Sequence, residues 1–164
     1  MRIIVSAFVA MLVLPIAALA DPSTAPDYTA TDQVQFAKLE AGNGTWRCKD
    51  TPANEKPDVI TGKQIGNWYL WSETGDDPST TYVRWVHTLK GYVQNEIDAS
   101  GSTEIYTTTS LDPFNAVWKP QFPPRSGLYP IAYAFTGGVM TASGKYRDRK
   151  THQVLAFKAV CSKG

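Results

Sequence analysis

Side chains able to take part in acid–base or metal chemistry are few in this sequence. His87 alternates with apolar residues, and in an extended strand it would share a face with Val83, Trp85 and Leu89. A histidine on such a face is either buried and bonded to a neighbour such as Asn95, or a polar group that orients a ligand in a cavity. Both interpretations place His87 inside the fold.

Catalysis is not indicated by any pattern in the chain. The sequence contains no Gly-x-Ser-x-Gly, His-Glu-x-x-His or P-loop motif, and we predict no catalytic residue. Glu96, Asp98 and Glu104 alternate on predicted strands, where we expect them to lie on a solvated face rather than to form a catalytic pair. His152 follows a basic stretch, residues 147–150, and is expected to lie exposed in a turn.

Aromatic rings offer another kind of chemistry, because a ring can fill a core, line a cavity or meet a partner. Trp68 and Trp71 would point to opposite faces of one predicted strand, so both faces of that strand carry an aromatic ring. Some of these rings must therefore be exposed, line a cavity or contact a partner.

The segment from residue 112 to residue 130 is rich in proline, which cannot donate to a sheet ladder. We therefore predict a stiff loop that presents Trp118, Phe122 and Arg125. Such a loop either simply crosses between elements, or forms a lid over a barrel mouth or an edge that binds a partner.

Residues 1–20 have the pattern of a secretory signal peptide. Arg2 precedes an apolar run over residues 3–14, and a small-x-small stretch at 18–20 precedes Asp21. A membrane-spanning helix needs roughly 20 apolar residues, so we expect cleavage before Asp21 rather than an anchor, and no membrane span after it. We therefore expect an exported protein, either periplasmic or secreted.

Charge argues against two classes of partner. The chain has 16 basic and 15 acidic residues, and residues 1–20 hold one of the basic residues and none of the acidic ones. The remainder is therefore neutral and has no basic cluster. This balance argues against nucleic acid as a partner and against docking to anionic membranes.

The elements that must position these residues follow from periodicity. Residues 21–30 are predicted to be a flexible arm and residues 31–164 a single domain, with a short helix from Thr31 to Ala41. From Thr45 onward the pattern has period two, and turn residues recur about every ten residues. This pattern predicts an antiparallel meander, hence a barrel or a sandwich. The predicted strands lie near 45–50, 59–63, 65–73, 81–89, 92–98, 103–110, 114–118, 129–136, 138–146 and 153–161. Of these, 59–63 or 114–118 is the first candidate for a loop.

Side-chain alternation also predicts the register of one hairpin. A bulged turn over residues 89–91 would place the apolar alternating sets of its two strands on one face. The predicted pairs are Trp85 with Asn95, Val83 with Ile97, and Arg84 with Glu96.

Cys48 and Cys161 are the only cysteines of the chain. In an exported protein they most simply form one disulfide, and a metal pair or a reactive thiol are the alternatives. Two ligands are too few for a structural zinc site. A disulfide needs Cα atoms roughly 4.4–6.8 Å apart, so the first and last strands would be neighbours, and in a meander that adjacency closes a barrel.

The two ends of the domain resemble a known family. A short helix followed by Gly-Thr-Trp at residues 44–46 resembles the lipocalin-like (calycin) barrels, in which Gly-x-Trp opens the first strand. The closer resemblance, over residues 33–163, is to small exported bacterial barrels of that type, which share the stretch 44–48 and the ending 161–163. The resemblance implies an all-β fold, an antiparallel meander closed into a lipocalin-like β-barrel with a short N-terminal helix.

The resemblance also bears on two further side chains. Lipocalins proper carry an Arg on the last strand that covers the Trp of the first strand, and the basic residue that we expect on this strand is Lys158, on the opposite alternation from Phe157. A haem-binding branch of small barrels uses a histidine on a late strand as axial ligand, and His152 would take that role. Outside this minor alternative, we predict no cofactor and no metal site.

We predict that the barrel binds a small apolar or amphipathic molecule. The main alternative is a protein–protein interaction module without a ligand, anchored by Trp118, Phe122 and Arg125, and an enzyme is a minor alternative. A cavity of a few hundred Å³ would favour ligand binding, and a core filled by side chains would favour the interaction module. The candidate lining residues are Trp46, Trp85, His87, Asn95, Tyr133 and Phe135.

Overall fold

The computed structural model describes residues 29–53, 56–123, 128–148 and 151–164. The predicted signal peptide and nearly all of the predicted arm lie outside these residues, and so does Arg125. Within the described part, no helix has the length and the apolar character needed to cross a bilayer.

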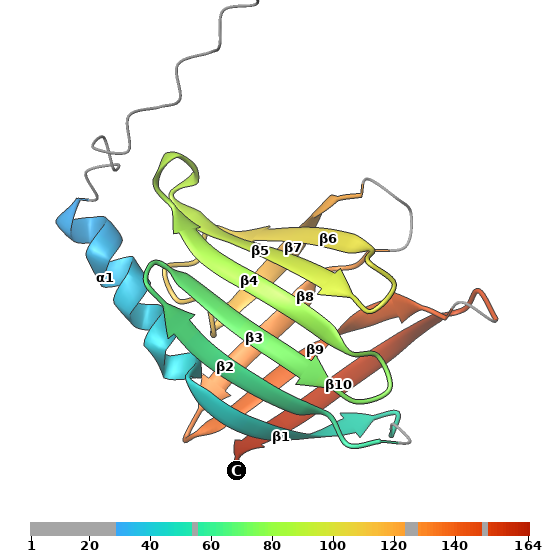
Figure 1. Cartoon of the computed structure of the whole chain (residues 1–164). Helices are drawn as coiled ribbons and strands as arrows, with labels where there is room; N and C mark the ends of the chain where they lie inside the picture. Colours follow the sequence, from blue (N-terminus) through green and yellow to red (C-terminus); the bar gives the residue numbers. More distant parts are fainter. Residues whose placement is uncertain (1–28, 54–55, 124–127, 149–150) are drawn as a thin grey trace, which may run out of the picture.

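The described residues form one α-helix, two short 3-10 helices and ten strands (Figure 1). The helices are α1 (Ala30–Lys38), η1 (Leu39–Gly42) and η2 (His87–Leu89). The strands are β1 (Gly44–Thr51), β2 (Val59–Ile65), β3 (Trp68–Thr74), β4 (Ser79–Val86), β5 (Gly91–Asp98), β6 (Thr103–Thr108), β7 (Ala116–Phe122), β8 (Ile131–Thr136), β9 (Val139–Arg147) and β10 (Val154–Lys163).

The strands close into an antiparallel barrel, as predicted. Each strand pairs with the next one along the chain, and β1 pairs with β10. The two segments that were candidates for loops, 59–63 and 114–118, lie largely in β2 and β7. The predicted loop over 112–130 is therefore wrong for β7, where Pro120 pairs with Tyr106 beside a shift in register. Such a shift is the kind of place where a sheet tolerates proline.

The predicted disulfide joins the first and last strands. Cys48 and Cys161 are direct cross-strand partners with Cα atoms 4.0 Å apart, and their sulfur atoms are bonded. The covalent link therefore lies at the seam where the barrel closes.

The helix begins earlier and ends earlier than predicted. Thr29, not Thr31, is the N-cap, because Asp32 completes a capping box with it: each side chain accepts a hydrogen bond from the other's backbone N–H. The α-helix ends at Lys38, and the chain continues as the 3-10 helix η1 to Gly42.

Side chains of the barrel hold the helical segment over one end of it (Figure 1). The carbonyl of Gly42 accepts hydrogen bonds from Trp46 Nε1 at 2.9 Å and from Tyr69 Oη at 2.6 Å. Phe36 and Leu39 are fully buried against the core. This end of the barrel is therefore plugged.

The predicted register of the β4–β5 hairpin is wrong. Val86 pairs with Gly91 across a four-residue turn in which Lys90 adopts φ +46°, and Trp85 pairs with Tyr92 rather than Asn95. The reason lies on β5, where the side chains buried inside the barrel are Tyr92 and Gln94 and not their apolar neighbours. The pairs predicted for Val83 and Arg84 are displaced in the same way, because Val83 pairs with Gln94 and Arg84 with Val93.

The cation that covers Trp46 is Lys163, not Lys158. Trp46 and Lys163 are paired on β1 and β10, and the Lys163 ammonium lies 5.2 Å from the centroid of the indole ring. This distance is typical of a cation–π contact. The covering residue was missed because the last strand extends beyond residue 161.

Candidate ligand-binding cavity

The interior of the barrel is filled near α1 and hollow at the other end. Trp46, Tyr69, Trp85, Tyr92 and Trp118 are buried together in the filled half. Rings such as Trp85 and Tyr92 pack edge to face, with centroids 5.2 Å apart.

A cavity of about 350 Å³ occupies the other half of the barrel. An eight-stranded barrel is just wide enough to be filled by side chains or to hold one small ligand, so the ten strands described here leave more room. The apolar side of the lining is formed by Ile60, Trp71, Ile131, Tyr133, Met140, Phe157 and the Cys48–Cys161 disulfide.

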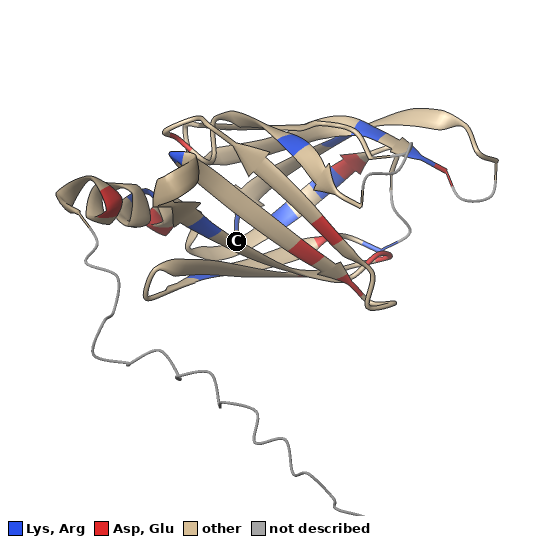
Figure 2. Cartoon of the chain, turned by 90° about the horizontal axis from the view of Figure 1, so that it is seen from above, with Lys and Arg blue, Asp and Glu red and all other residues tan. Residues whose placement is uncertain are grey.

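The charged residues that line this inner cavity, among those the structure describes, are all acidic. No lysine, arginine or histidine is among the described residues that line it. Figure 2 shows acidic positions gathered at the end of the barrel away from α1. The carboxyl residues of the lining are Asp50, Asp58, Glu73, Asp77 and Glu96.

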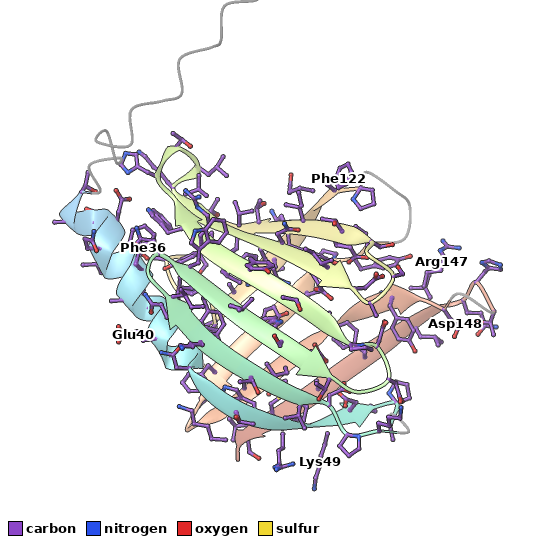
Figure 3. All side chains as sticks on the ribbon, in the orientation of Figure 1. Phe36, Glu40, Lys49, Phe122, Arg147 and Asp148 are labelled. Atoms are coloured by element: carbon purple, nitrogen blue, oxygen red, sulfur yellow. A yellow bond between two sulfur atoms is a disulfide. The ribbon has the colours of Figure 1, made fainter. Side chains whose placement is uncertain are left out.

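A second hollow, of about 470 Å³, adjoins the inner cavity toward the rim. The two share lining residues, among them Asp77, Glu96 and Tyr146. Unlike the inner cavity, this outer hollow includes basic side chains, Lys145 and Arg147. Arg147 and Asp148 lie near the tip of the β9–β10 hairpin, which projects beyond the barrel (Figure 3). The other charged residues of the outer hollow are Asp98 and Glu104.

Strand register explains how the chain positions the cavity wall. Trp71 on β3 pairs with Thr81 on β4, which in turn pairs with Glu96 on β5. One step nearer the rim, Glu73 pairs with Ser79. Because side chains two residues apart in a strand share a face, each of these strands presents a buried polar or aromatic group to the interior.

Burial and crowding disturb the titration of the cavity carboxyls. Burial, with the charges of Glu104 and Asp77 nearby, raises the pKa of Glu96 to about 7. Burial, with the charges of Asp58 and Glu96, raises the pKa of Glu73 well above its ordinary value. Both groups therefore favour the protonated form unless a cation compensates. The other titratable groups nearby are Asp50, Asp98, Tyr106, Tyr133 and Tyr146, with Tyr129, Lys145, Arg147 and Asp148 in the outer hollow.

Several buried polar atoms on the same wall have no hydrogen-bond partner within the described part of the chain. They are Trp71 Nε1, Ser79 Oγ, Thr81 Oγ1 and Gln94 Oε1. Leaving a buried polar group unpaired costs about 1–3 kcal/mol. Of these four residues, Trp71 lines the inner cavity, so a ligand or solvent molecule that accepts a hydrogen bond from its Nε1 would be favoured there.

Of the six residues predicted to line a cavity, Tyr133 lies in the inner one. Trp46 and Trp85 are buried in the filled half, and Phe135 packs edge to face against Trp46 with centroids 5.8 Å apart. Asn95 lies on the outer face of β5, because the side chains of β5 that point inward are the alternate ones.

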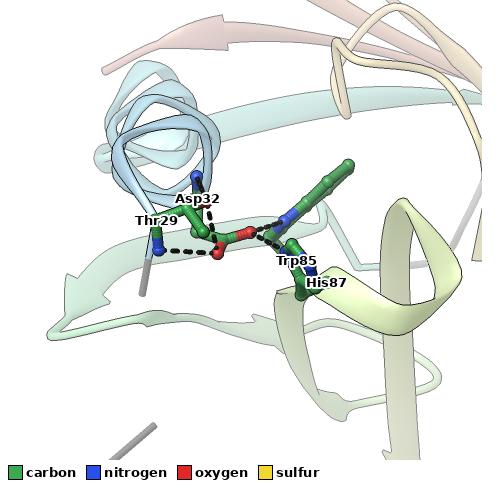
Figure 4. A network of polar contacts seen from close by, with 4 residues as sticks. All are labelled: Thr29, Asp32, Trp85 and His87. Atoms are coloured by element: carbon green, nitrogen blue, oxygen red, sulfur yellow. Dashed lines mark hydrogen bonds and ion pairs between the residues drawn. The ribbon is translucent and has the colours of Figure 1, made fainter. Parts of the chain in front are cut away.

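His87 is outside the barrel, contrary to prediction. It lies in the turn η2 with its side chain 62% exposed, and its Nδ1 is 3.0 Å from Asp32 Oδ1. The same carboxylate oxygen accepts a hydrogen bond from Trp85 Nε1 at 2.6 Å (Figure 4). His87 therefore helps to attach the helix and does not face a ligand cavity.

Asp32 is the centre of this network, and sequence reasoning missed it. Burial raises the pKa of Asp32, but hydrogen bonds from His87, Thr29 and Trp85 outweigh that effect and hold it near 2. The signal that could have revealed it was the Thr29-x-x-Asp32 spacing of a capping box.

The predicted interaction residues do not form one surface in the described part of the chain. Trp118 is buried and donates from Nε1 to the Pro113 carbonyl at 3.0 Å, so it does not lie on an exposed loop. Phe122 is half exposed at the end of β7 (Figure 3). Arg125 lies outside the described residues.

An apolar groove of about 410 Å³ on the outer face was not predicted. Its rings include Trp68 and Tyr82, which pack edge to face, and Arg84 lies 4.8 Å from the centroid of Trp68. The remaining lining residues are Ile65, Leu70 and Asn95.

Two observations bear on metal and haem chemistry. Among the described residues, no group of three His, Cys, Asp or Glu side chains is arranged to hold a metal ion. His152 lies exposed beyond the end of β9, in the turn that leads to β10, and its carbonyl accepts a hydrogen bond from Arg147.

The sequence prediction misassigned two carboxyl residues. Glu96 and Glu104 were expected on a solvated face, but Glu96 lines the inner cavity and the outer hollow, and Glu104 lines the outer hollow. Comparison of the sequence with protein-family models and with curated proteins gives no match.

Proposed function

We propose that this protein is an exported barrel that binds a small amphipathic molecule in its inner cavity. The observation that carries the proposal is the lining of that cavity, which combines rings such as Trp71 and Tyr133 with buried carboxyls such as Glu73 and Glu96. A volume of about 350 Å³ falls within the range of small-molecule sites, which are mostly apolar with a few polar groups.

Two features support placing the chain among exported, lipocalin-like barrels. The Cys48–Cys161 disulfide suits an oxidising compartment, as does the signal-like composition of residues 1–20. A closed barrel in which Lys163 covers Trp46 suits the lipocalin-like arrangement of a basic residue over the first-strand Trp.

Uptake of a neutral fluorescent probe, N-phenyl-1-naphthylamine, tests the proposal. Ala142 lines the inner cavity, and Ala142→Trp would fill it. Ala134 on the adjacent strand β8 is exposed on the outer face, so Ala134→Trp is a matched control. We expect the chain and A134W to take up the probe and A142W to bind it at least about tenfold more weakly. Equal uptake by A142W, with an unchanged melting profile, would contradict the proposal.

A protein partner is the second candidate function. The outer groove favours it, because Ile65 is 55% and Trp68 42% exposed there. Trp68→Ala would weaken binding to such a partner while leaving probe uptake in the inner cavity unchanged.

A further inference from the structure

We infer that the inner cavity selects organic cations: amines whose ammonium group lies beside Glu73 and Glu96 while an apolar body packs against Trp71. The inference rests on the proposed function and names the class of ligand. It is carried by the charge balance of the cavity and by its rings.

The charge balance of the inner cavity is one-sided. Its described lining includes Glu73, Asp77 and Glu96 and no basic side chain, whereas the outer hollow also contains Lys145 and Arg147. A buried carboxylate without a counter-charge is strongly disfavoured. A ligand that brings one positive charge therefore gains more there than a neutral ligand of the same shape, and an anionic ligand is repelled.

The rings of the cavity point to the same chemistry. Trp71 and Tyr133 meet at an interplanar angle of 63° with centroids 5.7 Å apart, so the cavity offers aromatic surface, to whose faces cations are attracted. Trp71 Nε1 is also buried without a partner among the described residues, so this ring has a polar group that only a ligand or solvent can pair.

A metal cation fits this site less well than an organic one. The acidic residues come from several strands and their flanking loops, and no three of the described His, Cys, Asp or Glu side chains are arranged to hold a metal ion. Calcium needs six to eight oxygen ligands at short range. An ammonium group with an apolar body instead makes use of both the diffuse negative charge and the rings.

Three probes share the same phenyl group and short alkyl chain but differ in charge, so they show whether the cavity prefers a cation: 3-phenylpropylamine, 3-phenylpropan-1-ol and 3-phenylpropanoate. Calorimetric titration near pH 8.5 keeps the amine protonated. We expect the amine to bind at least about tenfold more tightly than the alcohol, and the carboxylate to bind more weakly than either. Comparable binding of amine and alcohol, or a preference for the carboxylate, would overturn the inference and leave the proposed function intact. Absence of binding by all three would overturn both.

Variants that neutralise Glu73 and Glu96 test whether these carboxyls bind the ammonium group. In the double variant Glu73→Gln/Glu96→Gln, we expect the preference for amine over alcohol to fall about tenfold while alcohol binding is retained. Glu40 is exposed on η1 at the plugged end (Figure 3), so Glu40→Gln makes the same chemical change far from the cavity. A preference that survives in the double variant, or that is lost equally in E40Q, would overturn the assignment of the ammonium site. Binding of the alcohol and the melting profile show that the double variant is folded.

Discussion

Asp32 illustrates how one side chain ties the helix to the barrel. Its carboxylate accepts hydrogen bonds from the N-cap residue Thr29 and from Trp85, and it pairs with His87. Because these groups hold the pKa of Asp32 near 2, below its ordinary value of 3.8, the ionised form is bound more tightly in the folded state.

We predict that Asp32 stabilises the fold above about pH 4 and that this contribution is lost as the pH falls toward 2. Asp32→Ala should lower the melting temperature at neutral pH, and the difference from the unsubstituted chain should shrink across that window. Glu40→Ala, an exposed acidic residue nearby in the chain, is the control and should show no such trend. A melting difference for D32A that is the same at pH 2 and pH 7 would contradict the account.

Glu96 in the cavity should change the pH dependence of stability in the opposite direction to Asp32. The pKa of Glu96 is about 7, above its ordinary value of 4.5, so the folded chain retains a proton that the unfolded chain has lost. Stability should therefore fall as the pH rises from 4.5 through 7. Glu96→Gln should remove much of this loss and gain on the order of 1–3 kcal/mol near pH 8. Urea denaturation at pH 5 and pH 8 measures it, and an unsubstituted chain that is more stable at the higher pH would refute it.

At the scale of elements, the helical segment works as a plug. Leu39 is fully buried under the barrel end, and Leu39→Ala should lower the free energy of unfolding by about 2–5 kcal/mol. Val34 on the same segment is 56% exposed, so Val34→Ala should change it by less than about 1 kcal/mol. Denaturant titration of both variants tests this difference, and equal losses would show that the segment does not close the core.

The disulfide holds the seam of the barrel. It closes a loop of 113 residues, and removing it in Cys48→Ala/Cys161→Ala should lower the free energy of unfolding by about 2–5 kcal/mol. Denaturant titration measures the loss, and thiol titration of the unfolded, unreduced chain should find no free thiol. Two titratable thiols in that chain would contradict the assigned bond.

The order of the strands was predictable because alternation and turn residues mark each one. β1 begins at Gly44 before Trp46, and β10 carries Cys161 opposite Cys48, so local pattern and covalent chemistry agreed. The limits of the helix were less predictable, because they depend on which of two threonines, Thr29 or Thr31, is the N-cap.

The inner face of β5 was not predictable from hydrophobicity. Pattern reasoning places apolar residues inside, but this strand turns Gln94 and Glu96 inward and Asn95 outward. The hairpin register and the placement of Asn95 in the candidate site failed for this reason. A polar interior is unusual where its purpose is packing, and it is expected where the interior binds something.

At the scale of the whole molecule, the chain is almost neutral but its charged residues are unevenly distributed. The net charge is +1, yet the described lining of the inner cavity is acidic without a basic residue. The helical segment of α1 and η1 lies over one end of the barrel (Figure 1), and the inner cavity lies toward the other end. This asymmetry gives a packed core at the end near α1 and an acidic cavity at the other end.

Indole N–H signals of the tryptophans test the central claim, which is that a ligand enters the inner cavity. Trp71 lines that cavity and Trp68 lines the outer groove, so these two rings of β3 report on different sites. In a nitrogen–proton correlation spectrum titrated with 3-phenylpropylamine, we predict a saturable shift of the Trp71 indole signal while the Trp68 signal stays in place. A shift confined to Trp68, or no saturable shift of Trp71, would contradict the account.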